Sequence, residues 1–272
     1  MKPEVSVIIS FYNKIKYLEL LLAGFQNQTF KNFEIIIADD GSNPEVVKGI
    51  ESISSTYPFT VKHIWQEDKG FRKNRILNKA ILASSSDYLL FVDGDCIPHY
   101  AFVEEHFNYK KEKICLTGRR VNLSEKITNQ LTPQRVEERY LENNLLKLID
   151  DGLFGKSIDV EKGFYIRNHF LRNIFNKKKR GLLGCNFSIH KKDLLDINGF
   201  DERYEAPSIG EDTDIQYRLE LNGVEIKSLN NIAVQYHLYH KLQLRNPVNL
   251  SLFESVKESK TFFTPYGIKP LN

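Results

Sequence analysis

Hydrophobic and polar positions follow two alternating patterns over the first third of the chain. Short runs rich in Val, Ile and aromatic residues predict strands buried on both faces of a sheet. These runs lie at 5–10, 33–38, 60–65 and 88–92. Between them, apolar residues recur at helical spacing, at 15–25, from about Pro44 and over 71–83. Strand and helix thus alternate, which predicts an α/β fold whose central sheet is mainly parallel and flanked by helices.

The pattern changes after residue 118. Residues 119–180 are polar and charged with apolar positions at helical spacing, and we interpret them as a helical insertion on the sheet rather than a separate domain. Two further strands and one helix are predicted at 185–190, 232–236 and 211–221. No core pattern is visible beyond Pro247, which predicts a loose tail over 246–272. We expect a single domain over residues 1–245, followed by this tail.

Composition narrows the class of protein. The formal charge of +3 is too small to indicate nucleic-acid binding, so no nucleic-acid partner is expected. No apolar run approaches the roughly 18 residues of a spanning helix. The first strand starts at Val5, which leaves no room for a signal peptide. The three cysteines form no CxxC pair, which favours a reducing compartment. Together these features predict a cytoplasmic protein.

Two predicted strands end in acidic residues. Asp93-Gly94-Asp95 follows the strand at 88–92, and Asp39-Asp40 follows the strand at 33–38. In a parallel sheet both pairs lie at the carboxyl edge, where ligands of α/β proteins bind. Carboxylate oxygens there are suitable ligands for Mg²⁺ or Mn²⁺. Asp-Gly after a strand is also ordinary turn chemistry, and this alternative stays open for both pairs.

Three other groups of residues carry candidate chemistry. One predicted helix begins with positive charge, from Arg72, Lys73, Arg75 and Lys79. Positive charge at a helix start opposes the helix dipole, which indicates that an anion binds there. A solvated helix face is the alternative. Gly210-Glu211-Asp212-Thr213-Asp214 sets three carboxylates at a helix start, either as caps or with one acting as a general base. His237 and His240 follow the last strand, as surface residues or as metal ligands.

Several separated motifs resemble one family. Residues 5–13, 26–30 and 39–42 resemble the start of family 2 glycosyltransferases of the GT-A fold, and Asp93-Gly94-Asp95 resembles the DxD motif of that fold. Residues 184–188, 198–201 and 210–214 resemble the C-terminal half of β-1,4-galactosyltransferases and bacterial chondroitin-polymerase-type enzymes. The resemblance covers about residues 4 to 241, with the motifs in the family's order. It implies a nucleotide-binding half over 1–118 and an acceptor and catalytic half over 181–245.

The resemblance also implies roles for individual residues. The nucleotide of a UDP-sugar would be bound by Ser10, Phe11, Asn13, Asp40 (at the uracil), Asp68, Arg72, Asp93 and Gly94. A Mn²⁺ or Mg²⁺ cofactor would be held by Asp95, by Asp93 where it does not contact the ribose, and by His237 or His240, of which we favour His237. Asp212 would be the catalytic base, and Glu211 would hold the acceptor sugar.

The chain departs from the galactosyltransferase pattern just before the acid pair. Those enzymes have a tryptophan- and glycine-rich loop there, whereas this chain has Tyr204-Glu205-Ala206-Pro207-Ser208-Ile209, and its only tryptophan is Trp65. An indole that stacks on the acceptor is therefore missing from this loop. The resemblance does not extend to the identity of the acceptor.

The function expected from these features is transfer of a sugar from a UDP-sugar to a hydroxyl of a glycan or glycolipid. The reaction would depend on a metal, invert the anomeric carbon and serve bacterial surface polysaccharide synthesis. The alternatives are an NDP-sugar-forming nucleotidyltransferase, which would need a glycine-rich loop in place of Ser10-Phe11-Tyr12-Asn13, and a non-catalytic sugar-nucleotide-binding module. The basic run 177–180 is either a solvated loop or a peripheral contact with the inner face of the membrane.

Overall fold

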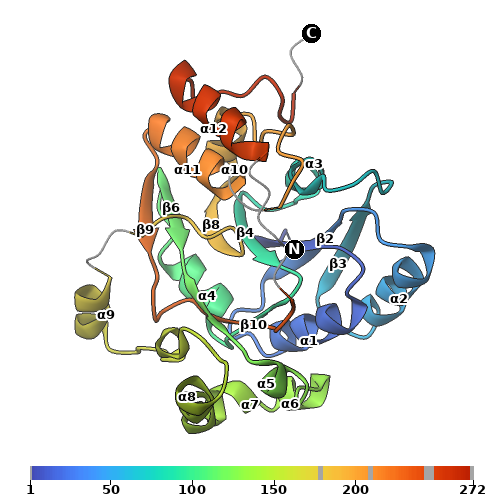
Figure 1. The fold of residues 1–272 in the computed structure, drawn as a ribbon, viewed down its shortest axis with the longest axis vertical. Helices are drawn as coiled ribbons and strands as arrows, with labels where there is room; N and C mark the ends of the chain where they lie inside the picture. The colour runs from blue at the N-terminus through green and yellow to red at the C-terminus, as the bar shows by residue number, and fades with distance from the viewer. Residues whose placement is uncertain (1, 177–179, 208–210, 242–247, 270–272) are drawn as a thin grey trace.

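The computed structural model describes residues 2–176, 180–207, 211–241 and 248–269. Within this part of the chain, one seven-stranded sheet has the order β3-β2-β1-β4-β8-β6-β9, and a smaller sheet has the order β5-β10-β7 (Figure 1). The strands of the large sheet are β1 (Val5–Phe11), β2 (Phe33–Asp39), β3 (Thr60–Trp65), β4 (Tyr88–Asp93), β6 (Ile114–Thr117), β8 (Asn186–His190) and β9 (Glu225–Ser228). Those of the small sheet are β5 (Cys96–Pro98), β7 (Arg119–Asn122) and β10 (Val234–His237).

The predicted mainly parallel sheet is confirmed. β1 pairs in parallel with β2 and β4, β2 with β3, and β6 with β9. Only β8 runs against its neighbours, between β4 and β6. The continuous apolar runs have the burial expected of central strands, since Ile35, Ile36 and Ile37 are all 0% exposed. The strands β5, β6, β7 and β9 escape prediction because each has only three or four residues, too few to show a period; β10 is as short, but it overlaps the longer predicted run 232–236.

Helices cover both faces of the large sheet. The first face carries α1 (Ile15–Gln26), α2 (Pro44–Ser54) and α4 (Phe102–Asn108); the second carries α3 (Lys73–Ala83), α10 (Lys191–Asp196) and α11 (Glu211–Leu221). Successive residues of β1 serve opposite faces, because side chains alternate along a strand. Val7 and Ile9 belong to the core under α1, whereas Ile8 belongs to the core under α3.

Short helices make up most of the segment between β7 and β8. They are α5 (Glu125–Thr128), α6 (Pro133–Glu137), α7 (Tyr140–Asn143), α8 (Leu145–Phe154), the 3₁₀ helix η1 (Val160–Gly163) and α9 (His169–Phe175). The first of these helices pack through Leu131 and Val136 against Leu20 of α1 and against the small sheet. The start of the predicted insertion differs, since Arg119–Asn122 is strand β7 and pairs with β10.

Residues 248–269 are packed, so the expectation of a loose tail is wrong for them. Helix α12 (Val248–Ser259) buries Phe253 and Val256. The chain then returns to Asn198, whose side chain donates to the carbonyls of Thr264 and Lys269 (2.7 and 2.9 Å) and accepts from the amide of Lys269 (2.8 Å). Because one side-chain amide makes these bonds, little of the contact shows in the hydrophobic pattern.

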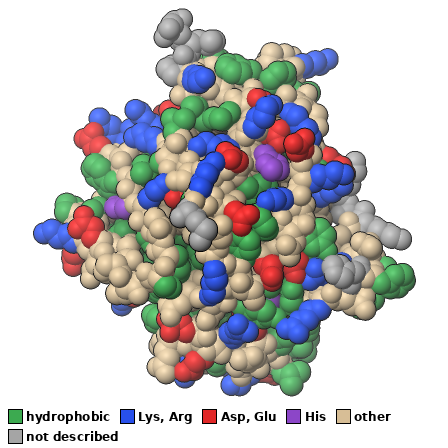
Figure 2. All heavy atoms as spheres, turned by 180° about the vertical axis from the view of Figure 1, so that it is seen from behind, with side chains coloured by type: hydrophobic (Ala, Val, Ile, Leu, Met, Phe, Trp, Pro, Cys, Tyr) green, Lys and Arg blue, Asp and Glu red, His purple; other side chains and the backbone are tan. Residues whose placement is uncertain are grey.

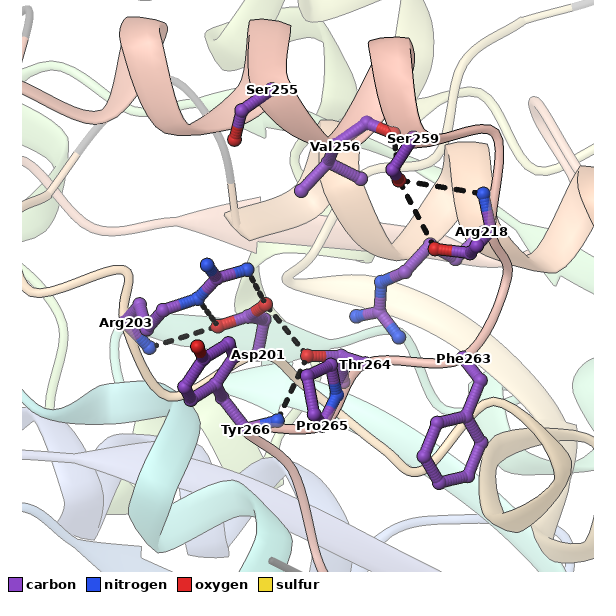
Figure 3. A pocket seen from close by; sticks show the side chains of 11 residues that line it. Asp201, Arg203, Arg218, Ser255, Val256, Ser259, Phe263, Thr264, Pro265 and Tyr266 are labelled. Atoms are coloured by element: carbon purple, nitrogen blue, oxygen red, sulfur yellow. Dashed lines mark hydrogen bonds and ion pairs between the residues drawn. The ribbon is translucent and has the colours of Figure 1, made fainter. Parts of the chain in front are cut away.

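A cavity of about 260 Å³ lies between α12 and this returning segment (Figure 3). On its floor Asp201 accepts two guanidinium bonds from Arg203 (3.0 and 2.7 Å) and one from the hydroxyl of Thr264 (2.7 Å). The guanidinium lies 4.0 Å from the ring centre of Tyr266. The motif at 198–201 therefore fastens the C-terminal segment to the loop before α11.

Candidate active site

The ends of β1 and β4 bring the first predicted site residues together. Ser10 pairs with Asp93 in the parallel register, and its hydroxyl donates to the Asp93 carboxylate (2.7 Å). The amide of Gly94 donates to the Ser10 carbonyl (2.8 Å). A Cβ on Gly94 would lie 3.0 Å from that carbonyl and 3.2 Å from the ring of Phe11, so the Asp-Gly-Asp turn approaches β1 closely. The acidic residues thus lie at the carboxyl edge of the sheet, where ligands of α/β proteins bind.

The second acidic pair divides into two roles. Asp39 is 0% exposed, accepts from the amide and hydroxyl of Ser42 (2.8 and 2.6 Å) and contacts His63 (2.9 Å), which is turn chemistry. Asp40 accepts from the side chain of Gln66 (2.6 Å) and from the amide of Arg72 (2.7 Å). Burial raises the pKa of Asp40, although these two hydrogen bonds oppose the effect.

The loops after β1, β2 and β3 form one continuous rim beside these acids. The hydroxyl of Tyr12 donates to Asp68 (2.9 Å), and a Cβ on Gly41 would lie 2.6 Å from the Cα of Asp68. Asn13 has a left-handed backbone (φ 55°), and its side chain accepts from the amide of Asn43 (3.0 Å). The guanidinium of Arg72 points back to the carbonyl of Glu67 within its own loop.

A second group of side chains surrounds Asp95. Strand β10 pairs antiparallel with β5 so that His237 lies opposite Cys96, and the amide of Leu238 donates to the Asp95 carbonyl (2.8 Å). The Nε2 atoms of His237 and His240 lie 3.6 and 3.3 Å from the Asp95 carboxylate and 3.2 Å from each other. The Nζ of Lys14 lies 3.3 Å from the same carboxylate.

The electrostatics of this group keep Asp95 ionised and His237 neutral. Burial alone would raise the pKa of Asp95, but the hydrogen bond with His240 and the charge of Lys14 lower it below its usual range. Burial lowers the pKa of His237 to about 4, which leaves a neutral imidazole with a lone pair at neutral pH. The hydrogen bond with Asp95 raises the pKa of His240.

The donor atoms fit a hard divalent ion. One ligand atom each of Asp95, Cys96 and His237 lie within 4.8 Å of one another. Burial raises the pKa of the Cys96 thiol far above its usual value, so the thiol stays protonated and is a poor ligand. Asp95 and His237 then offer one oxygen and one nitrogen, and phosphate oxygens and water are the usual remaining ligands of Mg²⁺ and chemically similar ions.

Asp212 lies at the start of α11 and is fixed by Gly184. The amide of Gly184 donates to Oδ2 of Asp212 (2.9 Å), and a Cβ on Gly184 would lie only 2.1 Å from Oδ1. Burial raises the pKa of Asp212; the charge of Lys73 opposes this, and the charge of Asp93 adds to it. A carboxylate with a raised pKa is a stronger base than an exposed one. The side chain of Glu211 lies outside the described residues.

Three basic side chains lie beside these acids, and none of them is among the predicted site residues. Lys73 at the start of α3 lies 3.0 Å from Asp93 and, with burial opposing, helps to lower the pKa of that carboxyl. Lys14 pairs with Asp95 as described above. Arg120 of β7 donates to the Cys185 sulfur (3.2 Å), and its charge acts on both Asp93 and Asp212. Of the three, only Lys73 gave a signal in the sequence, within the basic start of its helix.

A mostly parallel seven-stranded sheet flanked by helices on both faces is the architecture of glycosyltransferases of the GT-A fold. The family model described as "Glycosyl transferase family 2" matches residues 6–186, and "N-terminal domain of galactosyltransferase" matches residues 170–241. The chain belongs to glycosyl transferase family 2.

Individual relatives agree with this assignment. The chain is 26% identical to a chondroitin synthase of Escherichia coli over 86% of its own length and 34% of that protein, and 23% identical to a hyaluronan synthase of Pasteurella multocida over 87% and 25%. The chain thus spans about a third or less of these two relatives.

Solved structures show the same fold. A structure of S. aureus TarS in complex with UDP-GlcNAc matches with a TM-score of 0.58 and 19% identity, over 94% of this chain and 65% of that one. A mannosyltransferase of Pyrobaculum calidifontis with GDP-Man and Mn²⁺ matches with a TM-score of 0.57 and 12% identity, over 96% and 70%.

Proposed function

We propose that this protein is a metal-dependent, inverting glycosyltransferase that moves a sugar from a UDP-sugar to a hydroxyl of a glycan or glycolipid. The observation that carries the proposal is the approach of Asp93, Asp95, Asp212 and His237, from three separate segments, around Lys73 and Lys14. Packing alone gives no reason for three carboxylates to share one edge. The UDP-GlcNAc in the TarS structure supports a UDP-sugar as the donor.

In this proposal the nucleotide lies along the rim formed by the loops after β1, β2 and β3. Ser10, Phe11 and Asn13 contribute the first loop, Asp40 the second, and Asp68 with Arg72 the third. Asp93 and Gly94 contact the ribose or diphosphate end. The tie between Tyr12 and Asp68 supports this arrangement, because it joins the first and third loops into one surface.

A Mn²⁺ or Mg²⁺ ion would be held by Asp95 and His237, with Asp93 and His240 beside it. When bound, the ion neutralises charge that develops on the departing diphosphate. The neutral imidazole of His237 supports this assignment, since a metal requires the unprotonated nitrogen. The Mn²⁺ in the mannosyltransferase structure supports the class of cofactor.

Asp212 is the proposed base. Its Oδ2 is held by the Gly184 amide, which leaves Oδ1 to accept the proton of the acceptor hydroxyl. Proton transfer accompanies attack of that hydroxyl on the anomeric carbon, because a carboxylate is too weak to deprotonate an alcohol beforehand. Attack from the face opposite the leaving group inverts the anomeric centre. Glu211 would orient the acceptor sugar.

The proposed setting is bacterial surface polysaccharide synthesis in the cytoplasm, at the inner face of the membrane. Chondroitin and hyaluronan synthases among the relatives support a glycan acceptor. Among the described helices, none is long and apolar enough to cross a membrane. Of the basic run 177–180, residues 177–179 lie outside the described part of the chain.

The test is Asp212→Asn, with Asp196→Asn, a partly exposed carboxylate of α10, as the matched control. Asp212→Asn should keep the thermal stabilisation by UDP with Mn²⁺ but lose transfer, whereas the control should keep both. UDP release from a panel of UDP-sugars, with and without acceptor glycans, measures turnover. Retained transfer by Asp212→Asn would remove the base assignment, and activity unaffected by EDTA would remove the metal.

A further inference from the structure

The described side chains of helix α9 have the reverse of the usual arrangement. Phe170, Leu171 and Ile174 are 72%, 42% and 46% exposed, whereas Arg172 is 5% exposed. A surface helix normally buries its apolar side chains and solvates its charges. Figure 1 shows α9 at the edge of the molecule, projecting away from the large sheet.

The buried arginine fixes this orientation. Its guanidinium forms paired bonds with Glu105 of α4 (2.8 and 2.5 Å), and its Nε donates to the Ile166 carbonyl (2.6 Å). The side chain of Asn168 caps the helix by accepting from the amides of Phe170 and Leu171 (2.9 and 3.2 Å). A buried ion pair contributes little net stability. The protein therefore gains little by turning Arg172 inward while three apolar side chains face water, unless something covers them.

The charge around α9 indicates what covers it. From Lys162 to Arg180 the sequence contains no Asp or Glu, and it contains seven Lys and Arg residues. Among the described ones, Arg167 is exposed and Arg180 is partly exposed, whereas Lys162 and Arg172 are paired with Glu161 and Glu105. Elsewhere acidic and basic side chains are interspersed, as on the face in Figure 2. An apolar face inside a segment of one positive sign is the combination that binds an anionic lipid surface.

We propose that the outer face of α9 docks into the headgroup region of an anionic bilayer. A second copy of the chain fits poorly, because a symmetric contact would place two acid-free basic segments against each other. A seven-residue helix also offers far less than the roughly 800 Å² per partner of a stable protein interface. A bilayer needs only a few inserted side chains and neighbouring positive charge.

This docking deepens the proposed function and rests on it in one respect. Helix α9 ends at Phe175, nine residues before Gly184, the residue that holds Asp212. Even fully extended, nine residues span at most about 32 Å. A docked α9 therefore keeps the proposed base within about 32 Å of the membrane surface, which favours a lipid-linked acceptor over a free soluble glycan.

The experiment is vesicle flotation of the full chain with phosphatidylcholine vesicles, with and without phosphatidylglycerol. The variant Phe170→Ser/Ile174→Ser removes the outer face. Leu82→Ser/Leu195→Ser is the matched control, because these side chains are 57% and 40% exposed on α3 and α10. We expect binding only to anionic vesicles, weakening with salt, and a loss of roughly tenfold or more in the α9 variant. The control should bind like the unaltered chain.

Four results would overturn the proposal: no flotation of the unaltered chain, equal binding to neutral vesicles, unchanged binding of the α9 variant, or an equal loss in the control. A dimer in light scattering that the α9 variant dissociates would assign the face to a second copy and also overturn it. Thermal stabilisation by UDP with Mn²⁺ should be the same in all variants, which checks folding. If that stabilisation is absent throughout while flotation follows the expected pattern, the catalytic proposal fails and the docking stands.

Discussion

Replacing Gly184 by alanine tests the position of the proposed base without removing its carboxylate. The new Cβ would lie 2.1 Å from Oδ1 and 2.6 Å from Cγ of Asp212, and real Cβ contacts are essentially never under 3.0 Å. The carboxylate must therefore move by about 1 Å or rotate away, which also strains its bond with the Gly184 amide. A misplacement of about 1 Å at a reacting group can cost about 100-fold in rate, or about 2.7 kcal/mol of barrier.

The assay is steady-state UDP release with the best donor and acceptor, together with donor binding by thermal shift. Gly184→Ala should lower kcat about 100-fold while the stabilisation by UDP with Mn²⁺ stays the same, because the nucleotide and metal residues are untouched. Gly49→Ala is the control, since a Cβ there meets Ile15 at an ordinary 3.4 Å inside helix α2. Turnover of Gly184→Ala within about threefold of the unaltered enzyme would refute the placement of Asp212 as the base.

Three further predictions follow from the charges of the site and the core. Lys73→Met removes a positive charge that lowers the pKa of Asp212, so the acid limb of the kcat–pH profile should move to higher pH; an unmoved limb would exclude Lys73 as a partner of the base. His237→Ala should abolish the extra thermal stabilisation that Mn²⁺ adds to that by UDP, whereas His190→Ala, at the last residue of β8, should keep it. Equal behaviour of the two variants would rule out His237 as a metal ligand. Burial lowers the pKa of His106 to about 3, so between pH 6.5 and that value the unfolded chain binds a proton at this residue and the folded chain does not. The free energy of unfolding should therefore fall by about 1.4 kcal/mol for each unit by which the pH is lowered. The free energy of unfolding, measured with denaturant between pH 6 and 4, should change less steeply with pH in His106→Gln than in the unaltered chain. An equally steep pH dependence would contradict this account.

The strands that carry the first acids could be predicted because each is long and continuously apolar. Once β1, β2 and β4 are assigned as parallel neighbours, Ser10, Asp39 and Asp93 must end at the same edge. The sequence leaves open which acid is a turn and which faces a ligand. That distinction depends on side-chain partners such as Ser42 and His63, which saturate Asp39.

The rest of the site depends on short elements and distant contacts. Strands β5 and β10 have three and four residues, too few for periodicity to place His237 beside Asp95. Without the family resemblance, nothing in the sequence indicates that His237 and His240 lie beside Asp95. Lys14 and Arg120 lie in polar stretches, where a cation is normally solvated, and only the folded chain shows that each faces a carboxylate or a thiol.

The pairing of β10 with β5 also sets when the site becomes complete during folding. A slip of one residue would turn His237 to the other side of the small sheet, because successive side chains alternate. During synthesis, a chain that has emerged only as far as β9 has all three loops of the nucleotide rim but no imidazole beside Asp95. In the proposed metal site, affinity therefore depends on the pairing of β10 with β5, so that metal binding would report that this strand is in place.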